Sequence, residues 1–440
     1  MQMHHVSGHP ARAGWQGTAD LVLLAMLVSS PVVAQQGDGA GQSGVVFLRG
    51  EEVWAVTLDG SRTLGPFTMG GHIDCLTTSP DGRYLACTTS PHSGVRVYQV
   101  SSDGTLAQVA ELKPGLVDIT CHMWSPDGRY LAVGTIPAAR EGPDGKPLPG
   151  PEATPDDALL RSGDADGSSH HVHILPWHPV DEGSPNRKGG GEPLRSAAIR
   201  PLPASLRAGL AWAPDSSWMA WVRPGRPQTP SRPDTICKTD LATALTTDLA
   251  PTDTGRFGHI LELTGSPDGK WLAYICEQTF KLSIFGSDGS AAPRPLTCDG
   301  DDGYFDLCWS PSGSLIAFTR PWGQYLSGRA YGVDLWVRNL ESGQATDLTN
   351  HKTLPTQLGW SRDGSQVVFH AAHADRDEYG DLYTADPATS VIKLPRRGCD
   401  PLPSEGGVGG GWGIPIQWLA MPDSAKSSRG DTVRPTDTAH

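Results

Sequence analysis

Positive charge is scarce in this chain. Its 440 residues include 35 Lys and Arg against 48 Asp and Glu, which gives a formal net charge of −13 at pH 7. An acidic surface repels phosphate backbones and anionic lipid headgroups. The charge balance therefore argues against nucleic acid or an anionic membrane as the main partner.

The common linear signatures of catalysis are missing as well. The sequence contains no Gly-x-Ser-x-Gly elbow, no Gly-x-x-x-x-Gly-Lys-Ser/Thr loop, no His-Glu-x-x-His and no Cys-x-x-Cys. An active site assembled from separate parts of the chain would leave no such signature, so an enzyme is not excluded. We expect no cofactor, although a calcium ion is possible.

Long apolar runs are also lacking, apart from a short stretch from Leu21 to Val28. This stretch is too short to span a bilayer as a helix. A polar segment precedes it, and the small residues up to Ala34 that follow are typical of a cleavage site. We predict a signal peptide over residues 1–34, a linker over 35–43, and a periplasmic or secreted protein with no transmembrane segment in the mature chain.

One turn is present in unusual number. The pattern Ser-Pro-Asp-Gly, in full or weakened form, begins at Ser79, Ser125, Ala213, Ser266, Ser310 and Ser361. Pro fixes φ at the first central position, and Gly takes the left-handed conformation that the turn needs next. Short apolar segments flank the copies, so each copy predicts a β-hairpin.

The spacing of these hairpins predicts a repeat architecture. Apart from one long gap, the copies recur at intervals of about 45–55 residues. A unit of this length with four short strands is typical of a propeller blade. The chain is therefore predicted to be all-β, with a single β-propeller of four-stranded blades over residues 44–420. We also expect a long loop insertion near 137–169 and a disordered tail over 421–440.

The two ends of the repeat region indicate how the ring closes. The first hairpin, residues 45–56, has no inner strand, and the segment 412–419 has no outer strands. Pairing them completes a seventh blade and removes two free sheet edges. Seven blades are predicted, and six blades with the N-terminal hairpin inside the sixth is the alternative.

The later strands of the units carry a second pattern. Asp334-Leu335-Trp336 precedes Asp347-Leu348-Thr349, and Asp381-Leu382-Tyr383 precedes Lys393-Leu394. Together with the Trp-Ser-Pro-Asp-Gly turns, this resembles the TolB-like, PD40 (WD40-like) group of β-propellers over roughly residues 44–420. The resemblance implies a bacterial envelope setting and protein–protein recognition. We expect neither the α/β domain that precedes the blades in TolB nor the hydrolase domain of the prolyl oligopeptidase group.

The ring geometry separates two faces. Every Pro-Asp-Gly turn joins the first and second strands of a blade, so these turns share one face. Connections from second to third strands and between blades emerge on the other, where the long segments are 137–169, 223–232, 320–330 and 371–380. Binding residues concentrate on loops held by a rigid scaffold, so this long-loop face is predicted to recognise a protein or a small ligand.

Two arginines stand at equivalent places on that face. Arg223 and Arg320 both lie nine residues past the turn proline of their blades. Two guanidinium groups on one surface would bind a carboxylate or phosphate bidentately, and Trp322, Tyr325 and Arg329 would add stacking surface. The alternative is that the arginines only cap strands and pair with acidic neighbours.

Ionisable residues on the inner strands are the other candidates. The predicted inner strands carry Asp74, Asp118, His122, Glu262 and Asp306. Four carboxylates and a histidine around a central channel suffice for acid–base catalysis, and they would make the chain a lyase or hydrolase acting on saccharide or peptide. The alternative is that these residues are polar only because the channel holds water.

Two motifs suggest metal ligands. Asp299, Asp301 and Asp302 lie in one Gly-containing loop and would offer oxygens to calcium, although the spacing is not that of an EF-hand. A solvated loop is the alternative. His171 and His173 share one face of a predicted strand and would supply two ligands to zinc or copper, but no third ligand is evident.

The eight cysteines include one pair that strand register brings together. If the first Pro-Asp-Gly turn contains a one-residue bulge, Cys75 and Cys87 lie opposite each other in one hairpin. They would be either bonded or packed as two small apolar groups. The sequence as a whole favours an exported, monomeric, non-enzymatic ring with a protein partner, and a propeller enzyme is the alternative.

Overall fold

The computed structural model describes the strand-forming part of the chain. The described residues are 43–49, 52–89, 94–101, 104–112, 117–137, 171–177, 201–204, 209–225, 234–251, 260–276, 281–296, 305–322, 332–350, 353–373, 379–397 and 416–420. The predicted signal peptide and tail, most of the linker and most of the 137–169 insertion lie outside these residues. Among the described residues, no helix is long and apolar enough to cross a membrane.

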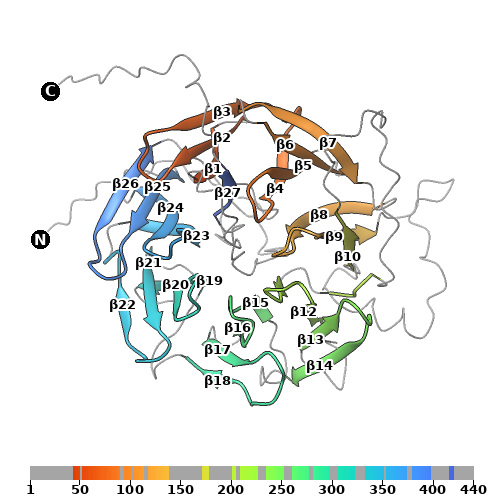
Figure 1. Cartoon of the computed structure of the whole chain (residues 1–440). Coiled ribbons are helices and arrows are strands. Elements are labelled where there is room, and N and C mark those ends of the chain that lie inside the picture. The colour runs from red at the N-terminus through yellow and green to blue at the C-terminus, as the bar shows by residue number, and fades with distance from the viewer. Residues whose placement is uncertain are drawn as a thin grey trace, which may run out of the picture.

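The described strands form seven antiparallel sheets arranged around a common axis (Figure 1). Successive sheets follow one another around the circle in chain order, as the colour gradient of Figure 1 shows. The chain is a seven-bladed β-propeller. The prediction of seven blades is confirmed.

Each blade runs from an inner strand to an outer strand. Blade 1 consists of β27 (Trp418–Ala420), β1 (Ser43–Arg49), β2 (Glu52–Thr57) and β3 (Thr63–Phe67). Blade 2 consists of β4 (Ile73–Thr78), β5 (Tyr84–Thr89), β6 (Val95–Val100) and β7 (Leu106–Leu112). Blade 3 consists of β8 (Val117–Trp124), β9 (Tyr130–Pro137) and β10 (His171–Pro176), with Leu202 bridged to Val172 beyond β10.

The other four blades follow the same order. Blade 4 consists of β11 (Leu210–Trp212), β12 (Trp218–Arg223), β13 (Thr235–Asp240) and β14 (Thr246–Pro251). Blade 5 consists of β15 (Ile260–Gly265), β16 (Trp271–Cys276), β17 (Lys281–Gly286) and β18 (Arg294–Pro295). Blade 6 consists of β19 (Phe305–Trp309), β20 (Leu315–Trp322), β21 (Gly332–Asn339) and β22 (Ala345–Asp347). Blade 7 consists of β23 (Thr353–Trp360), β24 (Val367–His373), β25 (Tyr379–Ala385) and β26 (Ile392–Arg397).

Blade 1 closes the ring by joining the two ends of the repeat region. β27 pairs antiparallel with β1, and the Cα partners include Val45 with Trp418. The Val46 N–H donates to the Gln417 carbonyl at 3.0 Å, which extends the pairing by one residue. The predicted closure by the N-terminal strands and a C-terminal inner strand is therefore confirmed.

The repeated turn is held by the residues that define it. The Ser79 hydroxyl donates to Asp81 Oδ1 at 2.5 Å and accepts from the Tyr84 N–H at 2.9 Å. The Arg83 N–H donates to the same Asp81 oxygen at 3.0 Å, and Gly82 has a φ of 71°. The turns that begin at Ser125 and Ser266 show the same bonds. Local hydrogen bonding therefore explains why the Ser-Pro-Asp-Gly pattern recurs.

Neighbouring turns also touch one another. A Cβ added at Gly269 would lie 2.9 Å from Pro214 Cδ of the preceding blade's turn, and one at Gly128 would lie 3.7 Å from Pro80 Cδ. Between blades 3 and 4 the Asp127 N–H donates to the Ser216 hydroxyl at 3.2 Å. We call this ring of Pro-Asp-Gly turns the turn collar. It gives one face of the propeller a tightly packed rim.

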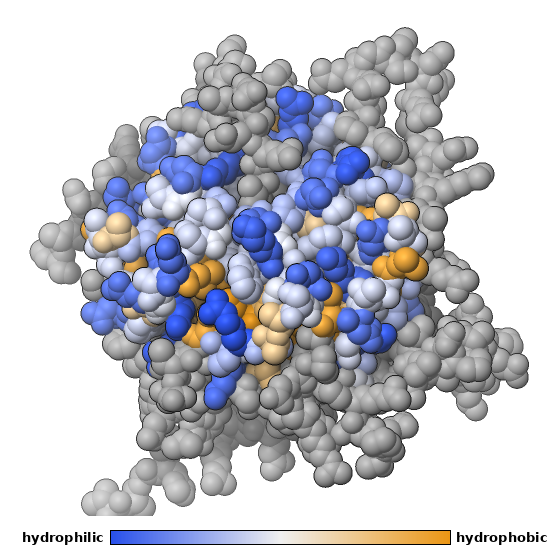
Figure 2. All heavy atoms as spheres, turned by 60° about the horizontal axis from the view of Figure 1, so that its bottom comes forward, coloured by the Kyte–Doolittle hydropathy of each residue, from blue (hydrophilic) through white to orange (hydrophobic). Residues whose placement is uncertain are grey.

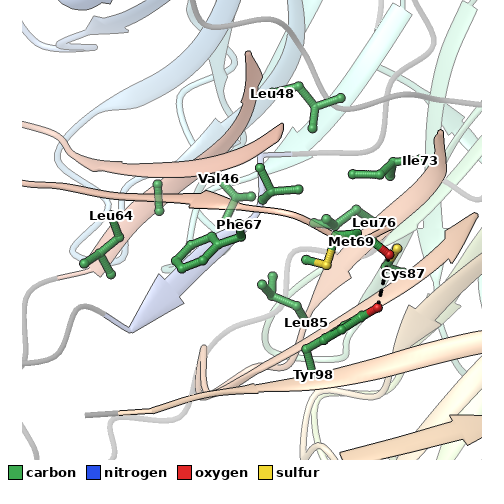
Figure 3. Packing of buried hydrophobic residues seen from close by; sticks show 12 residues of the cluster. Val46, Leu48, Leu64, Phe67, Met69, Ile73, Leu76, Leu85, Cys87 and Tyr98 are labelled. Atoms are coloured by element: carbon green, nitrogen blue, oxygen red, sulfur yellow. Dashed lines mark hydrogen bonds between the residues drawn. The ribbon is translucent and has the colours of Figure 1, made fainter. Parts of the chain in front are cut away.

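The core lies between blades. In the cluster shared by blades 1 and 2, Leu76 and Leu85 are fully buried beside Phe67 of blade 1 (Figure 3). The Tyr98 hydroxyl donates to the Met69 backbone carbonyl at 3.4 Å and so satisfies its polar end (Figure 3). Burying one such leucine contributes about 1.5–3 kcal/mol, so apolar packing supplies much of the stability of the ring.

The exterior is mainly polar. Figure 2 turns the bottom of Figure 1 toward the viewer, and hydrophilic side chains cover much of the described surface there, with smaller hydrophobic areas between them. In the described part of the chain, the large apolar residues classed as exposed are Leu245 and Val391, each at or beside an outer turn. These two positions lie on blades 4 and 7 and form no continuous patch.

The predicted register of the first Pro-Asp-Gly hairpin is wrong by one residue. Cys75 pairs with Thr88, whereas Cys87 pairs with Leu76, so the two cysteines point to opposite faces of the sheet. The bulge that we placed in the turn lies instead between Ile73 and Cys75. Cys75 and Cys87 are both buried, and no disulfide joins them.

Candidate functional site

Equivalent positions of the inner strands carry the most chemically distinctive side chains. The position four residues before the first residue of each turn is occupied, in blades 2 to 7, by Cys75, Cys121, Gly209, Glu262, Asp306 and Gln357. Glu262 and Asp306 thus occupy the same place in adjacent blades. Because β15 and β19 are neighbours in the ring, the fold brings these two carboxyl groups together.

Glu262 is buried and only half satisfied. Its side chain is 1% exposed, and Oε1 accepts a hydrogen bond from the Leu307 N–H of the next blade at 2.5 Å. Oε2 is buried and has no hydrogen-bond partner among the residues that the structure describes. Burial raises the pKa of Glu262 well above its usual value, and the nearby Asp306 carboxylate raises it further.

Asp306 is positioned by its own blade. Its Oδ2 accepts a hydrogen bond from the Thr319 hydroxyl on β20 at 2.9 Å. Its φ is 52°, at an irregularity of the ladder between Phe305 and Cys308, and its side chain is part buried. Removal from water raises the pKa of Asp306 from 3.8 to about 7, although the hydrogen bond from Thr319 opposes this shift.

The Glu262–Asp306 pair therefore holds at least one proton near neutral pH, because two adjacent buried carboxyl groups resist simultaneous ionisation. No Lys or Arg of the described residues contributes to the pKa of either group. The pair can accept or release a proton, and it can accept hydrogen bonds from a donor that enters the channel side of blades 5 and 6.

His122 lies elsewhere in the ring. It is 2% exposed on β8, and its Nδ1 is 2.8 Å from the Thr77 hydroxyl of blade 2. Burial lowers the pKa of His122 to about 3, so its imidazole is neutral at physiological pH. Its Nε2 is buried and without a hydrogen-bond partner in the part of the chain described. Figure 1 places β8 across the ring from β19, so His122 does not join the Glu262–Asp306 pair.

The other two channel candidates add nothing to this pair. Asp74 is part buried at the bulge of β4 in blade 2, and blades 3 and 4 separate it from β15. Asp118 belongs to β8, but its side chain lies outside the described residues. Of the five inner-strand candidates, the structure brings together Glu262 and Asp306.

Several inner-strand side chains join neighbouring blades. Gln417 Oε1 accepts from the Thr78 N–H of blade 2 at 2.8 Å, as Glu262 accepts from Leu307. The Trp360 indole of blade 7 donates to the Cys308 carbonyl of blade 6 at 3.1 Å. Polar residues next to the axis therefore help to hold the ring together.

Sequence reasoning missed Asp234, which joins two blades. This carboxylate is 1% exposed and accepts from the Gly225 N–H at 2.8 Å and from the Ile260 N–H of blade 5 at 2.9 Å. Asp334 holds the corresponding place in blade 6 and accepts from the Thr349 hydroxyl at 3.0 Å. The sequence signal for these carboxylates is the Asp at the start of the Asp-Leu-Trp pattern, which is Asp334 in blade 6.

The two arginines predicted to bind an anion lie at the ends of second strands. Arg223 on β12 forms an ion pair with Asp248 on β14, and Asp248 also accepts a hydrogen bond from the Cys237 thiol at 3.5 Å. The Arg320 guanidinium lies over the Trp336 ring, 5.3 Å from its centroid. The two arginines belong to blades 4 and 6, and blade 5 separates them.

The remaining site predictions are outside the described residues. This applies to Tyr325, Arg329, Asp299, Asp301 and Asp302, and to the side chain of Trp322. Within the described ranges no group of three or more His, Cys, Asp or Glu is placed to hold a metal ion. His173, one of the two candidate histidine ligands, has its Nε2 3.2 Å from the Thr135 hydroxyl.

Comparison with known proteins identifies the fold. No family model and no curated protein matches the sequence. A puromycin-hydrolysing peptidase of Mycobacterium tuberculosis is similar in structure, with a TM-score of 0.52 and 15% identity over 87% of this chain. A puromycin hydrolase gives 0.51 and 16% over 86%, and TolB from Acinetobacter baumannii gives 0.42 and 14% over 83%.

The similarities to the two peptidases show a shared fold and no more. The aligned region spans 57% of each peptidase chain and 66% of the TolB chain. The sequence identities are too low to carry an activity from those proteins to this one. The function therefore has to be argued from the residues of this chain.

Proposed function

We propose that this chain is an exported, non-catalytic propeller that recognises a protein or small ligand through its long-loop face. One observation carries the proposal. Two of the inner-strand groups that an enzyme would need bond to a neighbouring blade, since His122 contacts the Thr77 hydroxyl and Glu262 accepts from the Leu307 N–H. Groups used in this way stabilise a scaffold.

The strand order supports the choice of face. β9 and β10, and likewise β20 and β21, are second and third strands of their blades, so the segments that join them start and end opposite the turn collar. The segments that join blade to blade do the same. The ends of the longest connection, Pro137 of β9 and His171 of β10, therefore lie on the side opposite the turn collar. Long connections on a rigid ring are typical of a recognition surface.

The turn collar is less suited to recognition. Its turns are short, their Asp and Ser side chains bond back to the backbone, and Gly269 packs against Pro214. A surface whose polar groups are already satisfied gains little by contacting a partner. The two faces thus have different roles in the proposal.

A matched pair of variants tests the face. Full-length mature protein would be used to recover partners from envelope extracts, with Arg223→Ala/Arg320→Ala on the long-loop side and Arg129→Ala on the turn collar. The Arg129 side chain is 65% exposed, so its removal leaves the fold intact. We expect the double variant to lose a partner that Arg129→Ala retains. Equal recovery by both variants would remove the two arginines from the proposal.

A propeller hydrolase or lyase is the second candidate, and the Glu262–Asp306 pair is the observation that favours it. Two carboxyl groups that titrate at different pH values are a recurrent acid–base arrangement. Incubation with saccharide and peptide libraries would detect turnover. Turnover that Glu262→Gln and Asp306→Asn both abolish, while the folded structure persists, would replace the scaffold proposal.

A further inference from the structure

One carboxyl oxygen of Glu262, Oε2, lacks a hydrogen-bond partner among the described residues. Buried polar atoms almost always have a hydrogen-bond partner, so an exception calls for an explanation. The backbone of blade 6 satisfies Oε1, but no donor in the described ranges reaches Oε2, although Glu262 is 1% exposed. A carboxyl oxygen without a partner among the described residues therefore lies at the junction of blades 5 and 6, and it is an acceptor once Glu262 is ionised.

A second carboxyl group stands beside this acceptor. Asp306 comes from the neighbouring inner strand and is oriented by the Thr319 hydroxyl at 2.9 Å. Asp306 as a residue is part buried, whereas Glu262 is 1% exposed. Neither carboxyl group has an ion pair with a Lys or Arg of the described residues. When the pair is ionised, no basic side chain of the described residues balances its charge.

The chemistry of the pair selects the kind of ligand. Calcium takes six to eight oxygen ligands, and the described residues place no third acidic or metal-binding group at this point. An ammonium or guanidinium group needs only two or three acceptors, and its charge offsets that of a carboxylate.

We propose that the Glu262–Asp306 pair binds one positively charged N–H donor group, an ammonium or a guanidinium, that belongs to the ligand of the ring. This inference rests on the proposed binding function, because it names the chemistry that a ligand must present at the axis. The donor is carried either by a small molecule or by a basic side chain or N-terminus of a protein partner.

Binding is linked to proton release. Burial and mutual repulsion keep protons on the pair near neutral pH, since the pKa of Asp306 is about 7 and that of Glu262 is raised. A bound cation favours the ionised carboxyl groups and lowers their pKa values. Binding of a cation therefore releases, on average, a fraction of a proton, and the affinity of the pair for the cation rises with pH.

Calorimetry on the full chain tests the inference with simple probes. The probes are methylguanidinium, methylammonium and uncharged N-methylacetamide, titrated at about pH 6.5 in two buffers of different ionisation enthalpy. The variants are Glu262→Gln, which keeps an acceptor for the Leu307 N–H, and Asp306→Asn, since Asn tolerates a left-handed φ. Asp268→Asn in the turn of blade 5 is the matched control.

The expected result is binding of at least one charged probe, no binding of the neutral one, and proton release on binding. Glu262→Gln and Asp306→Asn should each weaken binding at least about tenfold, and Asp268→Asn should leave it unchanged. Equal binding of N-methylacetamide, or undiminished binding by Glu262→Gln, would overturn the inference, and so would a lack of binding by both charged probes.

A parallel measurement separates this inference from the proposed function. Partner recovery from extracts is repeated with Glu262→Gln, whose folding is checked by its unfolding transition. One outcome is that neither charged probe binds while the wild type still recovers a partner that Arg223→Ala/Arg320→Ala loses. In that case the proposal of a cation site is wrong and the proposed recognition function stands. If the charged probes bind and partner recovery is unaffected by Glu262→Gln, the donor belongs to a small ligand.

Discussion

Replacing Asp306 by Asn is expected to change how the stability of the ring depends on pH. Asp306 has a pKa of about 7 in the folded chain against 3.8 as its ordinary value, so the folded chain binds a proton that the unfolded chain releases. An acid whose pKa is higher in the folded than in the unfolded chain stabilises the folded state at low pH, and this contribution is lost as pH rises from about 4 to about 7. The wild type should therefore lose stability across this window.

The magnitude follows from the size of the shift. At about 1.4 kcal/mol for each tenfold change in proton affinity, the shift from 3.8 to about 7 corresponds to at most about 4 kcal/mol. Solvent access to the part-buried Asp306 reduces this, and we expect about 2 kcal/mol. Asn keeps an acceptor for the Thr319 hydroxyl but does not titrate. Asp306→Asn should thus be about 2 kcal/mol more stable than the wild type at about pH 8 and equal to it at about pH 4.

Urea unfolding followed by tryptophan fluorescence, repeated from about pH 4 to about pH 8, measures the difference. Asp59→Asn is a control of opposite sign, because the Thr57 hydroxyl and Ser61 lower the pKa of Asp59 to about 2. That contribution to stability is present above the ordinary pKa and lost in acid, so Asp59→Asn should be the weaker protein at neutral pH. Identical pH profiles for wild type and Asp306→Asn would refute the burial argument for the pair.

Three further predictions concern packing and access. Gly359→Ala places a Cβ 2.5 Å from Ile416 Cβ, where blade 7 packs against the segment that closes the ring. We expect the free energy of unfolding, measured by urea titration, to fall by about 1–3 kcal/mol. An unchanged urea midpoint would contradict this close packing. Gly269→Ala should lower the melting temperature more than Gly343→Ala. Both glycines have a left-handed φ, but the added Cβ at Gly269 lies 2.9 Å from a proline of the preceding turn, whereas that at Gly343 lies 3.9 Å from its nearest neighbour. Equal shifts of the two melting temperatures in calorimetry would rule out contact between turns. Cys87 should react with a thiol reagent only on unfolding, since burial raises its pKa to about 12, and fast labelling at neutral pH located there by mass spectrometry would show that it is accessible.

Much of the fold follows from local chemistry. The Ser-Pro-Asp-Gly turn is determined by hydrogen bonds within a few residues, such as that from the Tyr84 N–H to the Ser79 hydroxyl, so each copy could be identified without knowing its surroundings. Seven blades and their closure follow from counting strands, because free sheet edges are unfavourable. The Cys75–Cys87 register failed because the bulge lies at Asp74, where nothing in the local sequence marks it.

The candidate site was predictable only in part. Glu262 and Asp306 stand at the same offset from their turns, so the repeat register could have paired them, although it could not show that Oε2 of Glu262 lacks a donor. The ion pair of Arg223 with Asp248 depends on an irregular ladder between β13 and β14, which shifts at Ile236. Such contacts depend on tertiary register, which the sequence alone does not determine.

The most direct test of the account is to ask which face of the ring touches a partner. A photoreactive residue would replace Arg320 on the long-loop side or Arg129 on the turn collar in the mature chain, and cross-linked products would be identified after irradiation in envelope extracts. The account predicts a specific adduct from position 320 and none from position 129. Cross-linking of the same partner from position 129 alone would contradict the claim that recognition belongs to the long-loop face.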